Sequence, residues 1–251
     1  MRKVLTVLLM GSILFVLASC GSSTKSFVRI VNASPDAGAI DVTINGNKIA
    51  TSLAYGAGTN YFTLTPGTNI DLKIDTHGAV VFPFPTKITL LDKTYYTIAA
   101  VGIVGDPAHL PQPIPSTFTI LQTTDDHTAP GSTNVKIRVL QLDPYSDAMN
   151  PNPVDAYITP PATPINNTAP NFSNLTFQSP ASWVSVPFPT DGNLRIRVAP
   201  AGNTNPDGSN LPGWDSQTVL FKAGQVRTYV LLNNPAGTPF PNQSLMLNDL
   251  N

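Results

Sequence analysis

The sequence has 251 residues, with 14 lysines and arginines against 15 acidic residues, all of them aspartate, and with 25 prolines and 17 glycines. This mildly acidic balance argues against a nucleic-acid partner, which would need a basic stripe to replace phosphate counterions. The absence of glutamate, a strong helix former, beside so many turn-forming residues favours strands and loops. It also excludes HExxH metalloproteases and the closing glutamate of an EF-hand.

The first residues have the form of an export signal. Arg2 and Lys3 precede an apolar stretch from Val4 to Leu17, and small residues follow it. Because a membrane-spanning helix needs roughly 20 apolar residues, this stretch is too short to stay in a bilayer. We therefore expect residues 1–19 to be a signal peptide that is removed.

The end of that segment, Leu17-Ala18-Ser19-Cys20, is similar to the lipobox of bacterial lipoproteins. The resemblance implies a diacylglycerol on the thiol of Cys20 and acylation of the new amino terminus, so that residues 20–25 form a lipidated tether. Gly21 is not the aspartate that retains enteric lipoproteins at the inner membrane, so the expected location is the cell envelope, at the outer membrane in a Gram-negative organism. Acylation of the only cysteine leaves no thiol for a disulfide, a metal or catalysis.

An internal repeat organises the rest of the chain. Val28–Pro35 followed by Ile40–Ile44 corresponds to Ile137–Pro144 followed by Val154–Ile158, and three later segments also match. Two copies of roughly a hundred residues each predict two compact domains. We place them at residues 26–125 and 134–251, with residues 126–133 as a turn-rich linker.

Each copy carries the patterns of strands. Ile70, Leu72 and Ile74 alternate with polar residues at the period of a half-buried strand, and Asn45-Gly46 is typical of a tight type I′ hairpin. About seven short strands in each copy predict an all-β protein made of two tandem immunoglobulin-like antiparallel β-sandwiches. Counting strands leaves a barrel open as the alternative.

The segment Val28–Ala37, followed by Ile40-Asp41-Val42 and Asn45-Gly46, resembles the signature of a bacterial tandem β-sandwich family of unknown function. That family is common in exported lipoproteins and cell-surface proteins. The resemblance covers both copies and is weaker in the second, where Gln141-Leu142-Asp143-Pro144 replaces Asn32-Ala33-Ser34-Pro35. It implies the fold and the location, and it brings no catalytic residues.

Charged residues that recur in the two copies are candidates for chemistry. Arg29 and Arg138 match, as do Asp41 and Asp155, and we interpret them as a buried or rim ion pair of structural role in each domain. The run Asp125-Asp126-His127 falls at the linker without a second histidine nearby, so we interpret it as solvated and not as a metal or acid–base site.

A calcium loop is the only metal candidate. Asn203, Asn205 and Asp207 stand at alternate positions before Gly208, as in the first half of such a loop. Two of these side chains are neutral amides and Pro206 stiffens the segment, so an ordinary turn is the preferred interpretation. No metal or cofactor is expected.

Long insertions in the second copy are the expected binding surfaces, because such loops on a rigid scaffold usually carry function. Tyr145 and Trp214 fall in these insertions, where exposed aromatic rings would mark a surface for a ligand or partner.

No GxSxG elbow or phosphate-binding glycine loop occurs. The sequence thus predicts a lipid-anchored, non-enzymatic binding or scaffold module whose partner is an envelope protein or a glycan. The alternative is a carbohydrate-binding or carbohydrate-processing component of the cell surface.

Overall fold

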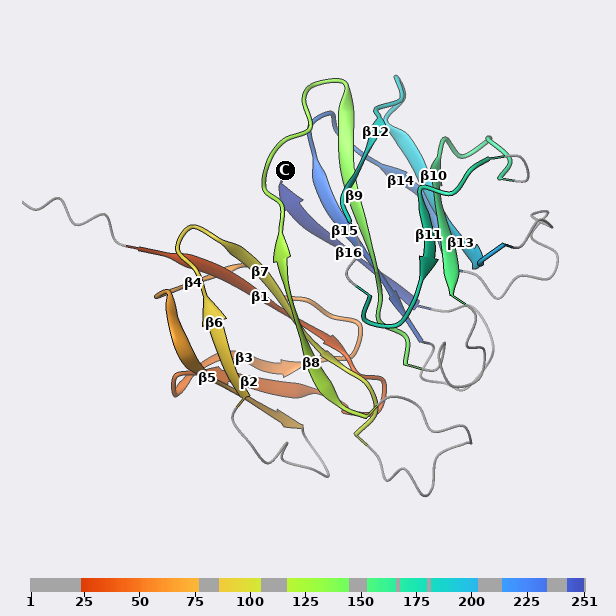
Figure 1. Cartoon of the computed structure of the whole chain (residues 1–251). Coiled ribbons are helices and arrows are strands. Elements are labelled where there is room, and N and C mark those ends of the chain that lie inside the picture. The colour runs from red at the N-terminus through yellow and green to blue at the C-terminus, as the bar shows by residue number, and fades with distance from the viewer. Residues whose placement is uncertain are drawn as a thin grey trace, which may run out of the picture.

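The computed structural model describes residues 24–76, 86–104, 117–144, 153–165, 168–179, 182–202, 214–233 and 243–250. These residues form sixteen strands in four four-stranded sheets, and they contain no helix (Figure 1). The predicted all-β fold of tandem sandwiches is confirmed. Within the described ranges, no helix is long and apolar enough to cross a membrane.

The first half of the chain forms two sheets. One has the order β4 (Phe62–Leu64), β1 (Ser26–Ala33), β7 (Tyr95–Val101), β8 (Thr119–Asp125). The other has the order β3 (Asn47–Leu53), β2 (Ile40–Ile44), β5 (Gly67–Thr76), β6 (Thr86–Leu90). Buried aliphatic residues of both sheets, among them Ile30, Ile40, Leu72 and Ile98, form one core cluster between them. The two-sheet arrangement is a sandwich and excludes the barrel alternative for this half.

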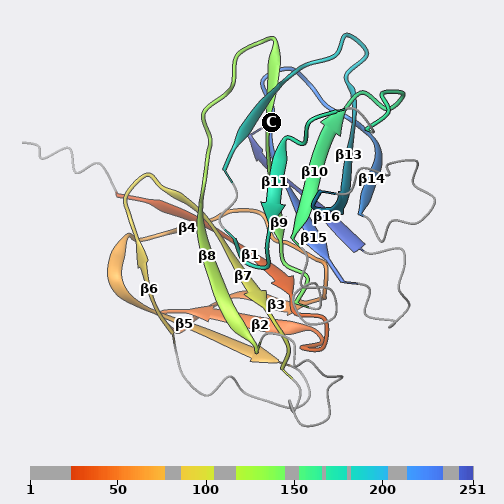
Figure 2. The same cartoon turned by 45° about the vertical axis from the view of Figure 1, so that its right-hand side comes forward.

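The second half repeats this topology strand for strand. One sheet has the order β12 (Val184–Pro187), β9 (Asn134–Gln141), β15 (Val226–Leu232), β16 (Gln243–Leu250). The other has the order β11 (Phe172–Leu175), β10 (Val154–Thr159), β13 (Asn193–Pro200), β14 (Asp215–Leu220), and Figure 2 shows this outer sheet most openly. A second core cluster lies between the two sheets. Each half thus has eight strands in the described ranges, one more than the sequence predicted.

Local pairing departs from the expected antiparallel pattern at one place in each half. β1 pairs with β7 in parallel, and β9 pairs with β15 in parallel, while the other strand pairs are antiparallel. The predicted hairpin between β2 and β3 is present, with Asn45 and Gly46 both at positive φ, 47° and 78°. Asparagine and glycine tolerate this conformation, which sets the tight turn.

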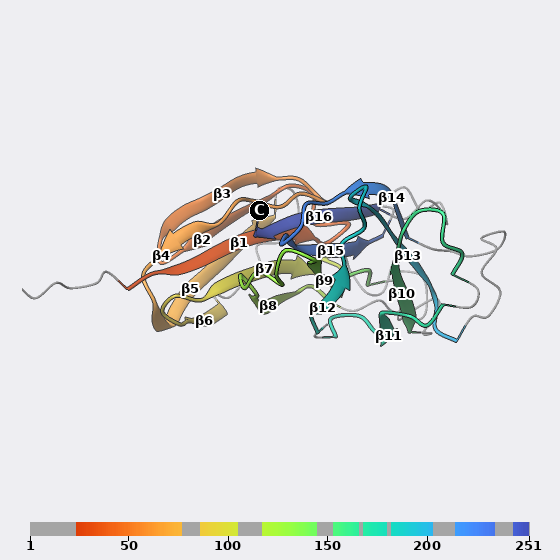
Figure 3. The same cartoon turned by 90° about the horizontal axis from the view of Figure 1, so that it is seen from above.

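The four sheets stack in succession, because the two inner sheets pack against each other. A third cluster of buried residues unites β1 and β7 with β9, β15 and β16; its members are Val31, Ala33, Ala99, Val101, Leu140, Leu142, Val230, Leu232 and Leu247. Figure 3 shows β15 and β16 lying beside β1 and β7. The approach is close: a Cβ atom added at Gly58 would lie 2.8 Å from Leu247 Cδ2 of the other half.

Burial follows from this stacking. β1 has seven buried residues of eight and β7 six of seven, whereas β3 has one of seven. Alternate residues of β1 face the core of their own sandwich, as Val28 and Ile30 do, or the other half, as Val31 does. Because β1 is covered on both faces, its polar residues Ser26, Arg29 and Asn32 are buried too and need partners inside the protein.

Candidate functional site

A cluster of buried charges lies between the two inner sheets, and Arg29 of β1 is one of its two cations. Its Nη2 is 2.5 Å from Asp249 Oδ1 at the end of β16 and 3.4 Å from Asp125 Oδ2. Its Nε donates to Thr97 Oγ1 at 2.8 Å, and its Nη1 donates to the carbonyl of Asn248 at 3.2 Å. The side chain is 2% exposed, so the guanidinium depends on these partners instead of water.

Arg138 of β9 is the second cation and repeats the arrangement. Its Nη2 donates to Asp125 Oδ1 at 2.6 Å, and its Nε donates to Thr228 Oγ1 at 3.3 Å. Its Nη1 donates to the carbonyl of Thr124 at 2.9 Å. Asp125 is completely buried, as Asp249 is.

The closest carboxylate of each arginine therefore comes from the other half of the molecule. Arg29 binds Asp249, and Arg138 binds Asp125. Each arginine also donates a hydrogen bond to a threonine of the strand that pairs in parallel with its own, Thr97 for Arg29 and Thr228 for Arg138. Thr97 in turn donates to Asp125 at 2.7 Å. The cluster thus links the two sandwiches by hydrogen-bonded ion pairs in which each charge has a partner.

Aromatic rings flank both arginines. Arg29 lies 4.9 Å from the ring centroid of Tyr61, and Arg138 lies 4.5 Å from that of Trp183, which is the repeat equivalent of Tyr61. The Tyr61 hydroxyl donates to Asp125 Oδ2 at 2.7 Å. Burial, and next the charge of Asp125, raise the pKa of Tyr61, so the phenol stays neutral.

Asp249 is a carboxylate of the cluster whose pKa is raised. Burial raises its pKa to about 6, against the attraction of Arg29, and the charge of Asp125 raises it further. A proton taken up by Asp249 would weaken its ion pair with Arg29.

The segment after β8 is fixed on the outer side of the cluster. The His127 ring stacks on Tyr95 with centroids 3.4 Å apart, and Phe27 stacks on Tyr95 at 4.3 Å. Partial burial lowers the pKa of His127. Asp126 binds Lys136 at 2.8 Å; hydrogen bonds from Lys136 and Thr128 lower its pKa, although partial burial opposes them.

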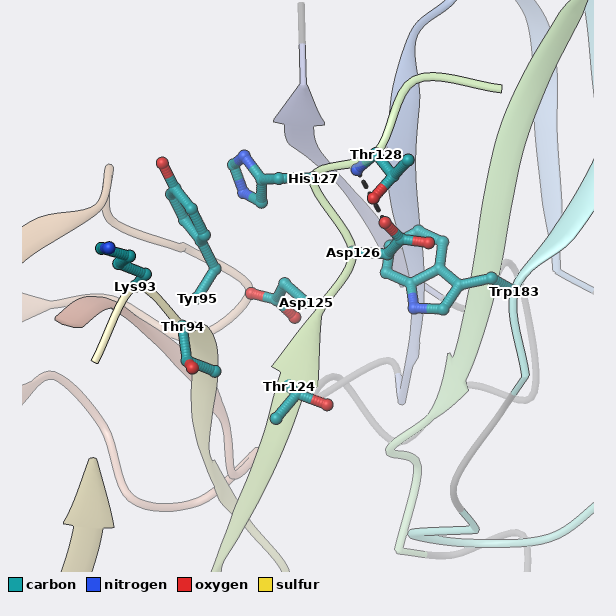
Figure 4. A pocket seen from close by; sticks show the side chains of 9 residues that line it. All are labelled: Lys93, Thr94, Tyr95, Thr124, Asp125, Asp126, His127, Thr128 and Trp183. Carbon is teal, nitrogen blue, oxygen red and sulfur yellow. Dashed lines mark hydrogen bonds between the residues drawn. The ribbon is translucent and has the colours of Figure 1, made fainter. Parts of the chain in front are cut away.

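A cavity of about 490 Å³ opens beside these groups, at the junction of the halves. Figure 4 shows Tyr95 and His127 on one side, Trp183 and Asp126 on the other, and Asp125 between them. Its lining is Lys93, Thr94, Tyr95, Thr124, Asp125, Asp126, His127, Thr128 and Trp183. Ligand cavities in proteins often lie at such domain junctions.

The polar groups of the cavity lining differ in whether they already have hydrogen-bond partners. The carboxylates of Asp125 and Asp126 already accept bonds from arginine, lysine, tyrosine and backbone donors. Within the described part of the chain, the amine of Lys93 and the indole nitrogen of Trp183 have no hydrogen-bond partner. The cavity thus presents these two free donors, and the Nε2 atom of His127, another residue of the lining, is also without a partner in the described ranges.

Two predictions about charged residues are wrong. Arg29 and Arg138 do not pair within their own copies with Asp41 and Asp155. Asp41 instead binds Lys48 at 2.7 Å, and Asp155 accepts from the backbone nitrogens of Asn174 and Gly202. These aspartates lie on β2 and β10, in the outer sheets, whereas the arginines lie in the inner sheets.

The expectation that Asp125-Asp126-His127 is solvated is also wrong. Asp125 is buried among the arginines, Asp126 is ion-paired and His127 is stacked. Asp249 was missed altogether. The signal for it was available, because the last strand, β16, repeats β8 and carries Asp249 one residue before its end, at the position that matches Asp125 at the end of β8.

Trp214 does not present an exposed ring. It is 4% exposed in the core of the second sandwich, and its Nε1 donates to the carbonyl of Leu232 at 2.7 Å. A buried indole with a satisfied donor is a packing residue, so the predicted partner surface at this position is wrong. Tyr145, Cys20 and the calcium-loop candidates Asn203, Asn205 and Asp207 lie outside the described residues.

The polar residues of the opening segment hold the first sandwich together. Asn32 Nδ2 donates to the carbonyls of Gly38 and Leu53, at 2.8 and 3.0 Å. The hydroxyl of Ser34 donates to the carbonyl of Gly102 at 2.7 Å. Both side chains are fully buried. They act as internal ties between loops, as buried polar groups that find partners do.

Comparison with known proteins adds one match. A protein-family model described as a domain of unknown function (DUF4397) matches residues 26–152, which span the first sandwich, the linker and the first strand of the second. No curated protein matches the chain significantly.

Proposed function

The chain belongs to the family of proteins that carry the domain of unknown function DUF4397, and we propose that it is a non-enzymatic scaffold of the cell envelope, anchored by a lipid on Cys20. The observation that supports the scaffold role is the exchange of aspartates between the halves, Asp249 to Arg29 and Asp125 to Arg138. Such an exchange fixes the relative orientation of the two sandwiches. A body with fixed orientation can hold a partner at a set position above a membrane.

The signature residues support the same proposal. Arg29 joins the halves, and Asn32 and Ser34 tie loops within the first sandwich. Polar side chains that form hydrogen bonds inside the protein stabilise the fold.

The lipid anchor is tested directly on the full-length chain expressed in a bacterium. We expect the protein to enter the detergent phase of a Triton X-114 extraction, and its amino-terminal peptide to carry the mass of acyl chains on Cys20. The Cys20→Ser variant should stay in the aqueous phase. An unmodified Cys20 peptide from the full-length chain would refute the anchor.

The fixed orientation is tested by the distance between spin labels on the two outer sheets, in a soluble form that lacks Cys20. Thr89 of β6 and Thr218 of β14 are exposed and suit labelling as cysteines. We expect one narrow distance distribution, which should broaden when Arg29→Leu is added. A broad distribution in the parent protein would refute the rigid scaffold.

Carbohydrate binding is the second candidate, and the cavity at the junction favours it. Free donors on Lys93 and Trp183 suit the hydroxyl and carboxylate oxygens of a sugar. A glycan array probed with the soluble protein and with its Trp183→Ala variant tests this function. Binding that is lost in the variant would support it, and an array without any bound glycan would remove it.

A further inference from the structure

The turn between β6 and β7 holds the chain just ahead of β1. The backbone nitrogen of Lys25 donates to Asp92 Oδ1 at 2.8 Å, and the backbone nitrogen of Lys93 donates to the carbonyl of Lys25 at 2.6 Å. Ser26 donates its hydroxyl to the carbonyl of Leu91. These bonds bring Lys25, Leu91 and Lys93 together, and we name these three residues the tether corner.

Leu91 projects from this corner into solvent. It is 59% exposed, and among the described residues only Leu220, at 64%, is a large hydrophobic residue of comparable exposure. An exposed leucine contributes nothing to the core of the sandwich. It is available for contact with an apolar phase.

The two lysines of the tether corner differ from the other described lysines of the first half. Lys48, Lys73 and Lys87 each bind an aspartate. Within the described ranges, neither Lys25 nor Lys93 makes an ion pair. Their two positive charges exceed the single negative charge of Asp92 in the same turn, although the chain as a whole has a net charge of −1.

The tether corner follows the expected anchor closely in the chain. Five peptide units separate Cys20 from Lys25, and at about 3.5 Å each they span at most about 18 Å. We propose that the tether corner rests on the surface of an anionic lipid bilayer, with Leu91 among the acyl chains and Lys25 and Lys93 on the headgroup phosphates. This inference rests on the lipid anchor of the proposed function.

The expected binding strength of the tether corner is enough to orient an anchored protein on the membrane, but not to recruit the protein to it. One lysine near an anionic surface improves binding about fivefold, which is too little to hold a protein alone. With the lipid already in the bilayer, the corner stays at a high effective concentration next to the headgroups. Because Lys93 also lines the junction cavity, docking of the corner places that cavity beside the bilayer.

Accessibility of a spin label tests the proposal in the lipidated, full-length protein. Leu91→Cys and, as the matched control, Leu220→Cys are labelled after acylation has consumed Cys20. The proteins are then reconstituted into vesicles of phosphatidylcholine and phosphatidylglycerol at 3:1. We expect the label at position 91 to collide with an aqueous nickel chelate at least fivefold less often than the label at 220, and to collide more often with oxygen. Lys25→Gln with Lys93→Gln should reduce this difference.

The outcomes separate the two proposals. Equal nickel accessibility at both positions in protein whose Cys20 peptide carries acyl chains would overturn the docking and leave the anchor intact. A Cys20 peptide without acyl chains would overturn both.

Discussion

Replacing Arg29 by leucine removes the cation that joins β1 to the end of β16. The buried carboxylate of Asp249 would keep the hydroxyl donor of Thr228 at 2.9 Å. The Tyr61 hydroxyl lies 3.2 Å away, but its one hydrogen is shared with Asp125 at 2.7 Å. Asp125 would keep Arg138. The substitution therefore leaves one buried carboxylate without a cation, and the effect should centre on Asp249.

The size of the effect follows from this geometry. Removal of one partner from a buried, hydrogen-bonded ion pair costs about 3–5 kcal/mol, and Arg29 also loses its bond to Thr97. We expect Arg29→Leu to lower the free energy of unfolding by this amount at pH 7.5. At pH 5 the loss should be smaller, because Asp249, with a pKa of about 6, is already largely protonated in the parent protein and its ion pair with Arg29 is weakened there.

Urea denaturation at pH 5 and pH 7.5 measures these changes. The double variant Arg29→Leu with Asp249→Leu should recover at least about 1 kcal/mol relative to Arg29→Leu alone, since it leaves no unpaired charge. Lys87→Leu is the control, because it breaks an exposed ion pair with Asp71 and should cost less than about 1 kcal/mol. Additive losses in the double variant, without dependence on pH, would refute the reasoning.

Three further predictions use the same urea assay. Gly58→Val should cost about 1–3 kcal/mol, because its side chain would crowd a buried leucine of the other half, whereas Gly67→Ala, with no atom nearer than 3.7 Å, should change little; equal effects would contradict the close packing. Trp214→Phe should cost about 1–3 kcal/mol, since it leaves the carbonyl that the indole now binds without its donor; an unchanged stability would show that this bond is dispensable. The raised pKa of Asp249, about 6 against about 3.9 in an unfolded chain, means that the folded state holds the proton more tightly, so stability should fall by about 3 kcal/mol as pH rises from about 4 to about 6. Asp249→Asn should reduce this dependence of stability on pH, and an unaltered dependence would show that another group causes it.

Much of the fold could be predicted from local patterns. Alternation at Ile70, Leu72 and Ile74 marks β5, and Asn45-Gly46 marks the turn before β3. These signals are local because pleating and positive φ are properties of one or a few residues. Because the second half repeats the first, the strands predicted in the first copy also predict those in the second.

The site could be predicted only in part, because its partners are far apart in the chain. Arg29 and Asp249 are 220 residues apart, and no spacing rule links them. The recurrence of Arg29 and Arg138 at matching positions of the two copies did indicate a shared role, but nothing local indicates that each arginine reaches into the other half. The expectation for Trp214 failed for a related reason: the length of the insertion before it suggested a surface loop, whereas the ring itself returns to the core.

The parallel pairing of β1 and β7 also has a mechanical consequence. β1 is the first described strand after the proposed anchor, and its pairs with β7 run in one register from Phe27 to Ala33. A pull on the chain ahead of Ser26, directed along the strand, would load these bonds together in shear, whereas a hairpin pulled from its open end separates one pair at a time. Because Arg29 also binds Asp249 of β16, tension on the tether would be transmitted to both halves of the molecule.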